Sequence, residues 1–170
     1  MKHVSDVTTD CATVCFFDPC ALPVDFAEQQ DADVLGSVRR ISDAGLLWFA
    51  ESDADGLYRI EFYVEETPAA NALRDAVPLP WKPKFKIPSG IVCVAPIEGI
   101  YGASDMDELP TKQSLPVEWF GRDCVFCVEP GCFDVISWSI DYSDETRYDP
   151  NIASTEYGPD YLVCMKRITE

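Results

Sequence analysis

The sequence contains a single histidine, His3, and this excludes catalytic and metal sites that need several histidines. A Ser-His-Asp or Cys-His arrangement would have to use His3, which lies in a terminus that we expect to fray. The glycine-rich phosphate motifs GxxxxGK(S/T) and GxGxxG are also missing. Chemistry that relies on histidine or on a cradled phosphate is therefore not indicated.

Positive charge is also scarce: 13 Lys and Arg residues stand against 30 Asp and Glu residues, for a net charge of −17. Binding DNA or RNA requires cations that neutralise phosphates, so nucleic acid and anionic membranes are excluded as partners. A basic protein is the natural complement, because a charge of this size accelerates the encounter. Solubility alone explains the same charge, and the sequence leaves both interpretations open.

Long apolar runs are absent as well. No stretch approaches the roughly 20 apolar residues that span a bilayer. The first six residues, Met1–Asp6, carry no apolar run of the kind found in signal peptides. We therefore expect a cytoplasmic protein in which the eight cysteines remain thiols. At 170 residues and 47% hydrophobic content, the chain (1–170) is expected to form one domain with a buried core.

The clearest pattern that is present lies in residues 45–65. From Tyr58 to Val64 the even positions are apolar, which is typical of a strand with one wet face. Residues 46–50 are apolar on both faces, so this strand is expected to be covered on both sides. Because Asp55-Gly56 between the two strands favours a tight reversal, we predict a hairpin.

Further strands are expected at 12–17, 91–95, 124–128, 132–142 and 161–165. In the fourth of these the apolar phase changes parity, which predicts a β-bulge near Val135. Apolar residues from Val34 to Ile41 share one helical face and indicate a short helix. A second stripe begins after Thr67-Pro68 and predicts a helix at about 68–77. The expected fold is all-β or β-dominated α+β: an antiparallel sandwich or partly open barrel of about seven strands with this one well-formed helix.

The first third of the chain resembles small uncharacterised bacterial β-rich proteins. The resemblance rests on Thr9-Asp10-Cys11-Ala12-Thr13-Val14, on Asp18 after the strand, and on the later Asp-Gly turn. That group has no established function, so the resemblance implies nothing about mechanism.

The cysteines are the first candidates for a metal site. Cys124 and Cys127 are three residues apart on a predicted strand and should face opposite sides of the sheet. A structural zinc ion needs four converging ligands, and the chain offers little histidine. Residues 51–56 imitate the start of a calcium loop, but Phe62 stands where its bidentate Glu belongs. We therefore expect buried thiols, no metal and no cofactor.

The long segment 143–160 is the feature that the predicted fold explains least. Its acids and tyrosines alternate, and connections of this length are uncommon unless they bind something. Tyrosine supplies large contact area at low entropic cost, and carboxylates pair with Arg or Lys. A loop packed by its own tyrosines remains the alternative. The candidate partner-binding residues are Asp144, Glu145, Tyr148, Asp149, Glu156, Tyr157, Asp105, Asp107 and Glu108.

Three classes of function remain open. The first is an acidic protein-binding module of the immunity or inhibitor type, which engages a basic partner. The second is a β-barrel that binds a small molecule. Its pocket would be lined by aromatic side chains: Trp48, Phe62, Trp81, Trp119 and Trp138. The third is a hydrolase that uses a carboxylate pair, with candidates among Asp105, Asp107, Glu108, Asp141, Asp144 and Glu145. We favour the first and expect no catalytic residues.

Overall fold

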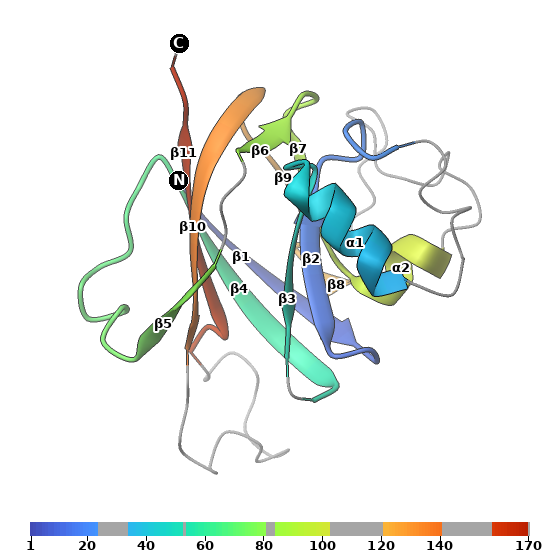
Figure 1. Ribbon diagram of the computed structural model, residues 1–170. Coiled ribbons are helices and arrows are strands. Elements are labelled where there is room, and N and C mark those ends of the chain that lie inside the picture. Colours follow the sequence, from blue (N-terminus) through green and yellow to red (C-terminus); the bar gives the residue numbers. More distant parts are fainter. Residues whose placement is uncertain (24–33, 53, 81–83, 103–120, 141–157, 170) are drawn as a thin grey trace.

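Two β-sheets pack face to face, and two helices cover the outer face of the smaller one (Figure 1). The computed structural model describes residues 1–23, 34–52, 54–80, 84–102, 121–140 and 158–169. Within these ranges the chain forms eleven strands and two helices. The β-dominated fold expected from the sequence is confirmed, as an open sandwich rather than a closed barrel.

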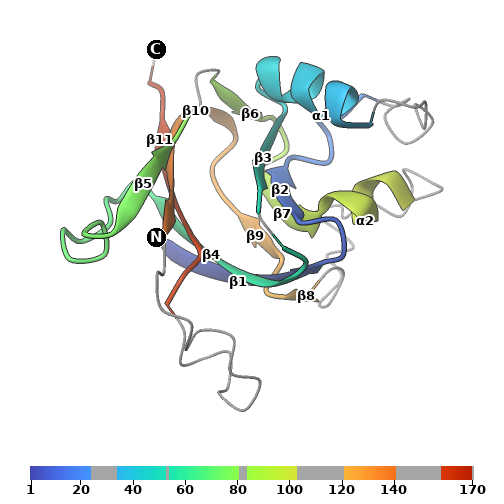
Figure 2. The same cartoon turned by 60° about the horizontal axis from the view of Figure 1, so that its bottom comes forward.

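The larger sheet has seven strands. Six follow the order β5-β10-β11-β4-β1-β8, and the seventh, β6, pairs with the start of β10 while β5 pairs with its end. These strands are β1 (Lys2–Thr9), β4 (Gly56–Val64), β5 (Ala76–Leu79), β6 (Phe85–Ile87), β8 (Gly121–Arg122), β10 (Gly131–Ile140) and β11 (Tyr161–Arg167). All pairs are antiparallel except β11 with β4. Figure 2 shows how strongly this sheet curves around the interior.

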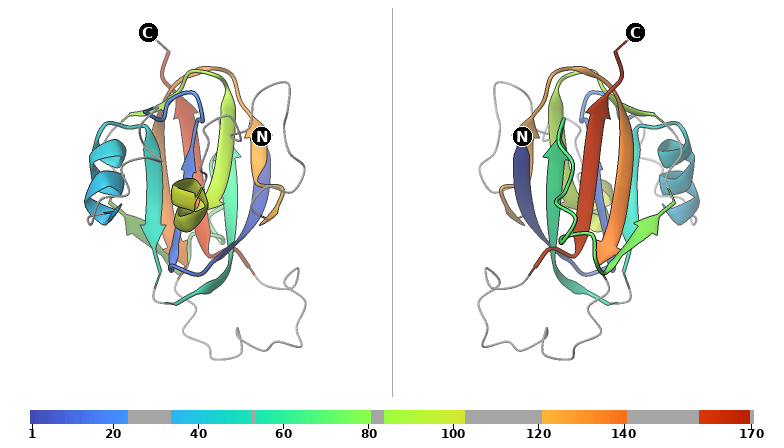
Figure 3. Two further views of the ribbon diagram at one scale, coloured as in Figure 1. Left: turned by 90° about the vertical axis from the view of Figure 1, so that its right-hand side faces the viewer. Right: turned by 90° about the vertical axis from the view of Figure 1, so that its left-hand side faces the viewer.

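The smaller sheet has four strands in the order β3-β2-β7-β9, all antiparallel. They are β2 (Thr13–Phe17), β3 (Leu47–Glu51), β7 (Ile91–Pro96) and β9 (Val125–Cys127). The helices α1 (Val34–Asp43) and α2 (Ile97–Gly102) lie on its outer face (Figure 3). Neither described helix is long and apolar enough to cross a membrane.

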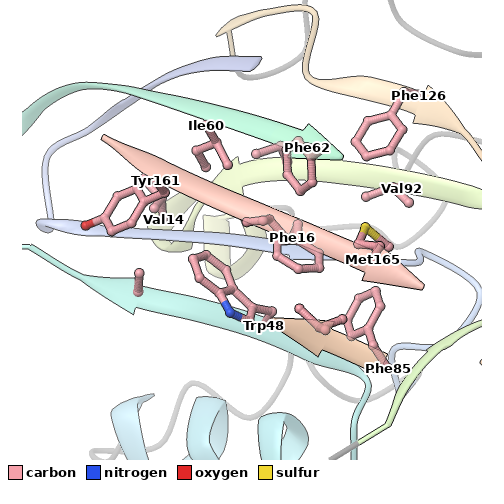
Figure 4. Close-up of a cluster of buried hydrophobic side chains, with 14 of the residues drawn as sticks. Val14, Phe16, Trp48, Ile60, Phe62, Phe85, Val92, Phe126, Tyr161 and Met165 are labelled. Atoms are coloured by element: carbon pink, nitrogen blue, oxygen red, sulfur yellow. The ribbon is translucent and has the colours of Figure 1, made fainter. Parts of the chain in front are cut away.

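The core divides into two layers because the smaller sheet is buried on both faces. Between the sheets, Phe16 stacks on Trp48 at 4.9 Å between ring centroids and meets Phe62 edge-on at 5.2 Å (Figure 4). On the other face, Leu47 and its neighbours pack against Val38 and Ile41 of α1. The prediction that the strand at 46–50 is covered on both sides is therefore confirmed, as is the short helix before it.

The predicted hairpin at 45–65 is wrong, although both of its strands exist. β3 pairs with β2 in the smaller sheet, whereas β4 pairs with β1 and β11 in the larger one. The chain therefore passes from one sheet to the other between the end of β3 and the start of β4. The alternation on β4 is confirmed, with Tyr58, Ile60, Phe62 and Val64 facing the core. Period and turn residues predict strands and a reversal, but they do not specify which strand pairs with which.

The predicted helix at about 68–77 is also wrong. Residues 69–76 form tight turns, in which the amide of Ala72 donates to the carbonyl of Ala69 at 2.9 Å and that of Ala76 to Leu73 at 3.3 Å. The chain then enters β5, which pairs with the end of β10. A single short helix is marginal on its own because nucleation is costly, and an alanine stripe buries little apolar surface. Strand pairing with β10 outweighs the local helical preference here.

The predicted bulge near Val135 does not occur. β10 pairs with β11 in one unbroken register, from Phe133 opposite Arg167 to Ser139 opposite Tyr161. The odd residues keep facing inward, so buried Ser137 takes the place of an apolar side chain and accepts a hydrogen bond from the Trp48 indole at 3.1 Å. Ile136 and Trp138 consequently point to the outer face of the larger sheet.

The N-terminus, predicted to fray, is a strand inside the larger sheet. β1 pairs with β4 along its whole length and with β8 at Asp6 and Val7. Its inward residues His3, Ser5 and Thr9 are polar, so the usual apolar alternation is missing. Each has a hydrogen-bond partner, as buried polar groups require.

Candidate functional site

The β1–β2 and β3–β4 connections meet the start of α2 at one end of the sandwich (Figure 1). Each of these three segments carries a carboxylate. We call Asp10, Asp55 and Glu98, which surround Cys11, the acidic end. The pKa of the Cys11 thiol is raised above its ordinary value, first by its partial burial and then by the negative charges of Glu98, Asp55 and Asp10. The raised pKa favours the protonated form of this thiol, which is the less reactive one.

A hydrogen-bond framework fixes the acidic end in place. The Glu98 carboxylate accepts the backbone amide of Asp10 at 2.6 Å and the hydroxyl of Thr9 at 3.1 Å. The carbonyl of Ala12 accepts both the amide of Ser52, at 2.7 Å, and its hydroxyl, at 2.9 Å. The β1–β2 connection is therefore tied to α2 on one side and to the β3–β4 turn on the other. These charges are held on a preformed surface.

The acidic end has no counter-ion in the described part of the chain. The ion pairs found there join Met1 to Glu66, Lys2 to Glu61, Arg39 to Glu51 and Arg59 to Asp6. Nor does any group of three or more His, Cys, Asp or Glu side chains in the described ranges have an arrangement that could hold a metal ion. Negative charges without a counter-ion attract a cationic surface from outside.

The nine partner-binding residues predicted from the sequence lie in 103–120 and 141–157, outside the described residues. The structure does describe the two ends that flank the second of these segments. The amide of Ile140 donates to the carbonyl of Asp160 at 2.8 Å, and the Asp160 carboxylate accepts the amide of Arg59 at 2.7 Å. Because β4 and β11 both start here, these flanks lie at the same end of the sandwich as the acidic end.

Arg59 carries the positive charge that the structure places beside these flanks, and it is engaged with Asp6. Its guanidinium binds both oxygens of Asp6, at 2.8 and 3.0 Å, in the paired geometry typical of strong Arg–carboxylate contacts. The pKa of Arg59 is raised, first by this hydrogen bond and then also by the charges of Glu61 and Asp160. With Arg59 paired to Asp6 and Lys2 paired to Glu61, Asp160 adds a negative charge at this end of the sandwich.

His3 connects β1 to the segment between β8 and β9. Its ring stacks on Phe126 at 4.3 Å between centroids, and its Nε2 is 2.7 Å from the carbonyl of Asp123, to which it donates. Burial lowers the pKa of His3. The imidazole links β1 to the chain that passes from β8 to β9, and that carbonyl also accepts the Ser5 hydroxyl at 2.8 Å.

The cysteines divide evenly between the interior and the surface. Cys15, Cys93, Cys124 and Cys164 are buried, whereas Cys11, Cys20, Cys127 and Cys132 are exposed, and all eight are free thiols. Cys124 and Cys127 face opposite sides, as their spacing predicts. Burial raises the pKa of Cys124 to about 12 and that of Cys93 further still, so these thiols are inert hydrophobic side chains.

The aromatic residues considered for a small-molecule pocket take three different places. Trp48 and Phe62 are fully buried in the packed core between the sheets (Figure 4). Trp138 lies half-buried on the outer face of the larger sheet. Trp81 and Trp119 fall outside the described residues. The described aromatics therefore do not line a common pocket.

Comparison with known proteins identifies the fold. No family model and no curated protein matches the sequence. Among solved structures, the protein titled "Crocagin biosynthetic gene J" is similar at 15% identity and a TM-score of 0.63, covering 99% of each chain. ComJ from Bacillus subtilis, titled an inhibitor of the DNA-degrading activity of NucA, is similar at 9% identity and a TM-score of 0.52, covering 97% of this chain and 95% of its own. The chain shares the fold of these two proteins over almost its whole length.

Proposed function

We propose that this chain is a protein-binding domain of the inhibitor type, which engages a basic partner through a surface that includes the acidic end. The observation that carries the proposal is the acidic end itself. Asp10, Asp55 and Glu98 surround Cys11 without a described counter-ion, on a surface fixed by hydrogen bonds. A preformed anionic surface complements clustered Lys and Arg and requires little reordering when it binds.

The fold supports the same proposal. ComJ, which has this fold, is titled an inhibitor of a DNA-degrading activity. A protein that degrades DNA needs a cationic surface to hold phosphates. We infer that the partner of this chain likewise has a phosphate-binding surface, which the acidic end would occupy. The net charge of −17 favours such a partner over an acidic or neutral one.

The loop residues predicted from the sequence complete the proposed surface. Asp144, Glu145, Tyr148, Asp149, Glu156 and Tyr157 lie in the sequence between Ile140 and Asp160, whose backbones are hydrogen-bonded to each other. In this proposal the carboxylates steer the partner, and the tyrosines provide apolar contact after docking. Asp105, Asp107 and Glu108 are assigned a secondary role in the same surface.

The proposal assigns binding, not catalysis, and places the protein in the cytoplasm, where its eight cysteines would stay reduced. It is supported by the engagement of His3 with Asp123 and Phe126 and by the raised pKa of the Cys11 thiol. Neither group has the properties of an activated base or nucleophile.

The test is affinity capture from native lysate at low salt, followed by binding kinetics with the purified captured protein. The double variant Asp10→Lys/Asp55→Lys reverses charge at the acidic end. Steering predicts that it lowers the association rate at least about tenfold and leaves the dissociation rate less affected. If the captured protein is an enzyme, its activity is measured with and without the chain.

The matched control is Asp43→Lys/Glu129→Lys, which makes the same change in charge at exposed residues of the opposite end of the sandwich. We expect its association rate to stay closer to that of the unaltered chain. A captured partner that is acidic, or binding that is indifferent to salt and equally weakened by both double variants, would contradict the proposal.

A further inference from the structure

An apolar strip runs along the outer face of the larger sheet, where polar side chains would be expected. It consists of Ile136, Trp138 and Ile140, three successive outward residues of β10. The Ile136 side chain is 54% exposed, among the most exposed large hydrophobic residues of the described chain. Trp138 and Ile140 are half-buried, and they lie opposite Pro78 and Ala76 of the adjacent strand β5.

The neighbouring strand shows that apolar side chains on this face can be covered. Leu162 and Cys164 of β11 point to the same outer face, opposite Trp138 and Ile136, yet they are 0% and 3% exposed. The connection from β4 to β5 runs along this side of the sheet (Figures 1 and 3), and the thiol of Cys164 donates to the carbonyl of Glu66 at 3.0 Å. This connection belongs to the fold, and among the described residues it leaves Ile136 exposed and Trp138 and Ile140 half-buried.

The charges that border the strip identify the chemistry of its occupant. Where β10 ends, Ile140 is hydrogen-bonded to Asp160 and lies opposite Ala76, which follows the exposed Asp75. Arg59 is nearby but is paired with Asp6, and Arg74 is the exposed cation next to Asp75. At the far end of the strip Asp134 lies opposite Lys166, so the two charges cancel there. The strip thus ends beside Asp160, at the same end of the sandwich as the acidic end, where an anionic surface favours a cationic occupant.

We infer that the strip of Ile136, Trp138 and Ile140 is the apolar anchor of the partner-binding surface, and that the occupant is a basic protein segment with apolar side chains among its Lys and Arg residues. The inference rests on the proposed function and adds where and how the partner is held. Protein interfaces place apolar and aromatic anchors in the centre and charges at the rim, and the anchors determine how slowly the complex dissociates.

The test uses two synthetic peptides of equal length and equal lysine content, one alternating Lys with Leu and the other Lys with Ser. Their binding to the full chain is measured by isothermal titration calorimetry at low salt. We expect the Lys–Leu peptide to bind at least about tenfold more tightly than the Lys–Ser peptide, because it can cover the strip. Ile136→Ser/Ile140→Ser should remove this difference and leave the affinity for the Lys–Ser peptide unchanged.

Val77→Ser is the matched control. Val77 is 51% exposed, close to the value for Ile136, but it lies opposite the inward-facing Ser139 and therefore not on the outer face. Equal urea midpoints for the three proteins verify that the variants are folded. If both peptides bind equally, or if Val77→Ser weakens Lys–Leu binding as much as the strip variant does, the strip is not an anchor and the acidic-end proposal still stands. If neither peptide binds, the basic-partner function itself is refuted, and the anchor with it.

Discussion

A buried carboxylate holds together the end of the sandwich opposite the acidic end. Asp18 is fully buried where the chain leaves β2. Its Oδ1 accepts the amide of Cys20 at 2.8 Å and the hydroxyl of Ser89 at 2.7 Å, and its Oδ2 accepts the amide of Ser89 at 2.7 Å. Three donors to one buried carboxylate make charge-assisted bonds, which are the stronger kind.

Asp18→Asn should therefore lower the free energy of unfolding by about 2 kcal/mol. The NH₂ group of the new Asn side chain must replace one of the two carboxylate oxygens. It then faces the backbone N–H of Cys20 or of Ser89, which is left without an acceptor. The Ser89 hydroxyl is poorly placed to compensate, because its oxygen already accepts the amide of Ile91 at 3.1 Å. Urea unfolding measures the loss. The exposed Asp43→Asn should change the free energy by less than about 0.5 kcal/mol, and equal effects of the two changes would contradict this role.

His3 makes the stability of the fold depend on pH. Burial lowers its pKa below the ordinary value of 6.5 that it keeps in the unfolded chain. Between 6.5 and the lowered pKa of the folded state, the unfolded chain binds more protons than the folded one, so the free energy of unfolding falls as the pH drops. Above this range His3 is neutral in both states and has no effect on stability. The urea midpoint should thus decline between about pH 7 and about pH 5.5.

Because His3 is the one histidine in the sequence, the assignment of this decline is direct. In His3→Gln the urea midpoint should stay flat over the same range, since no other side chain ordinarily titrates there. A decline of equal size in His3→Gln would show that another group is responsible.

At the scale of single elements, β4 offers an internal test of the register. Phe62 is 0% exposed, whereas Leu57 on the opposite face of the same strand is 50% exposed. Phe62→Ala should cost about 3–5 kcal/mol, because it removes an aromatic ring packed against Phe16 and Phe126. Leu57→Ala should change the free energy of unfolding by less than about 0.5 kcal/mol. Similar shifts in the urea midpoint would show that the faces of β4 are misassigned.

The elements that sequence patterns predicted well are those with a single dominant signal. The alternation in β4, the doubly apolar β3 and β7, and the closing strand β11 all occur where expected. β1 was missed because His3, Ser5 and Thr9 fill its inward positions and are satisfied by distant partners: Asp123 and Glu98. No local pattern contains those partners.

The errors share one physical origin, which is that tertiary pairing decides between local alternatives. Ala76 and Val77 fit a helical stripe, but β10 offers them a strand partner. Ser137 looked like a break in the apolar phase, but the Trp48 indole makes it a suitable core residue. The acidic end was missed for the same reason, since Asp10, Asp55 and Glu98 are far apart in sequence and meet through the fold. The predicted loop residues remain predictions.

At the scale of the whole molecule, the ion pairs of the described residues lie away from the acidic end. On the outer face of the larger sheet, Lys2 is paired with Glu61 and Arg59 with Asp6. These two cations thus neutralise acids of neighbouring strands, and no ion pair among the described residues includes Asp10, Asp55 or Glu98. A surface selected for stability alone would intersperse the two signs, whereas a surface kept for a cationic partner would not.

This separation predicts that removing charge from the acidic end stabilises the protein. In Asp10→Asn/Asp55→Asn the backbone amide of Asp10 still reaches Glu98, but two of the three negative charges around Cys11 are gone. We expect the free energy of unfolding to rise by about 0.5–1 kcal/mol at low salt, as for other relieved surface repulsions. The gain should vanish near 1 M salt, where the Debye length falls to about 3 Å.

Glu129→Gln, at the opposite end of the sandwich, should give a smaller gain. Urea titrations at both salt concentrations measure the difference. Destabilisation at low salt would mean that these carboxylates hold the fold together, and the argument that they are kept for a partner would fail.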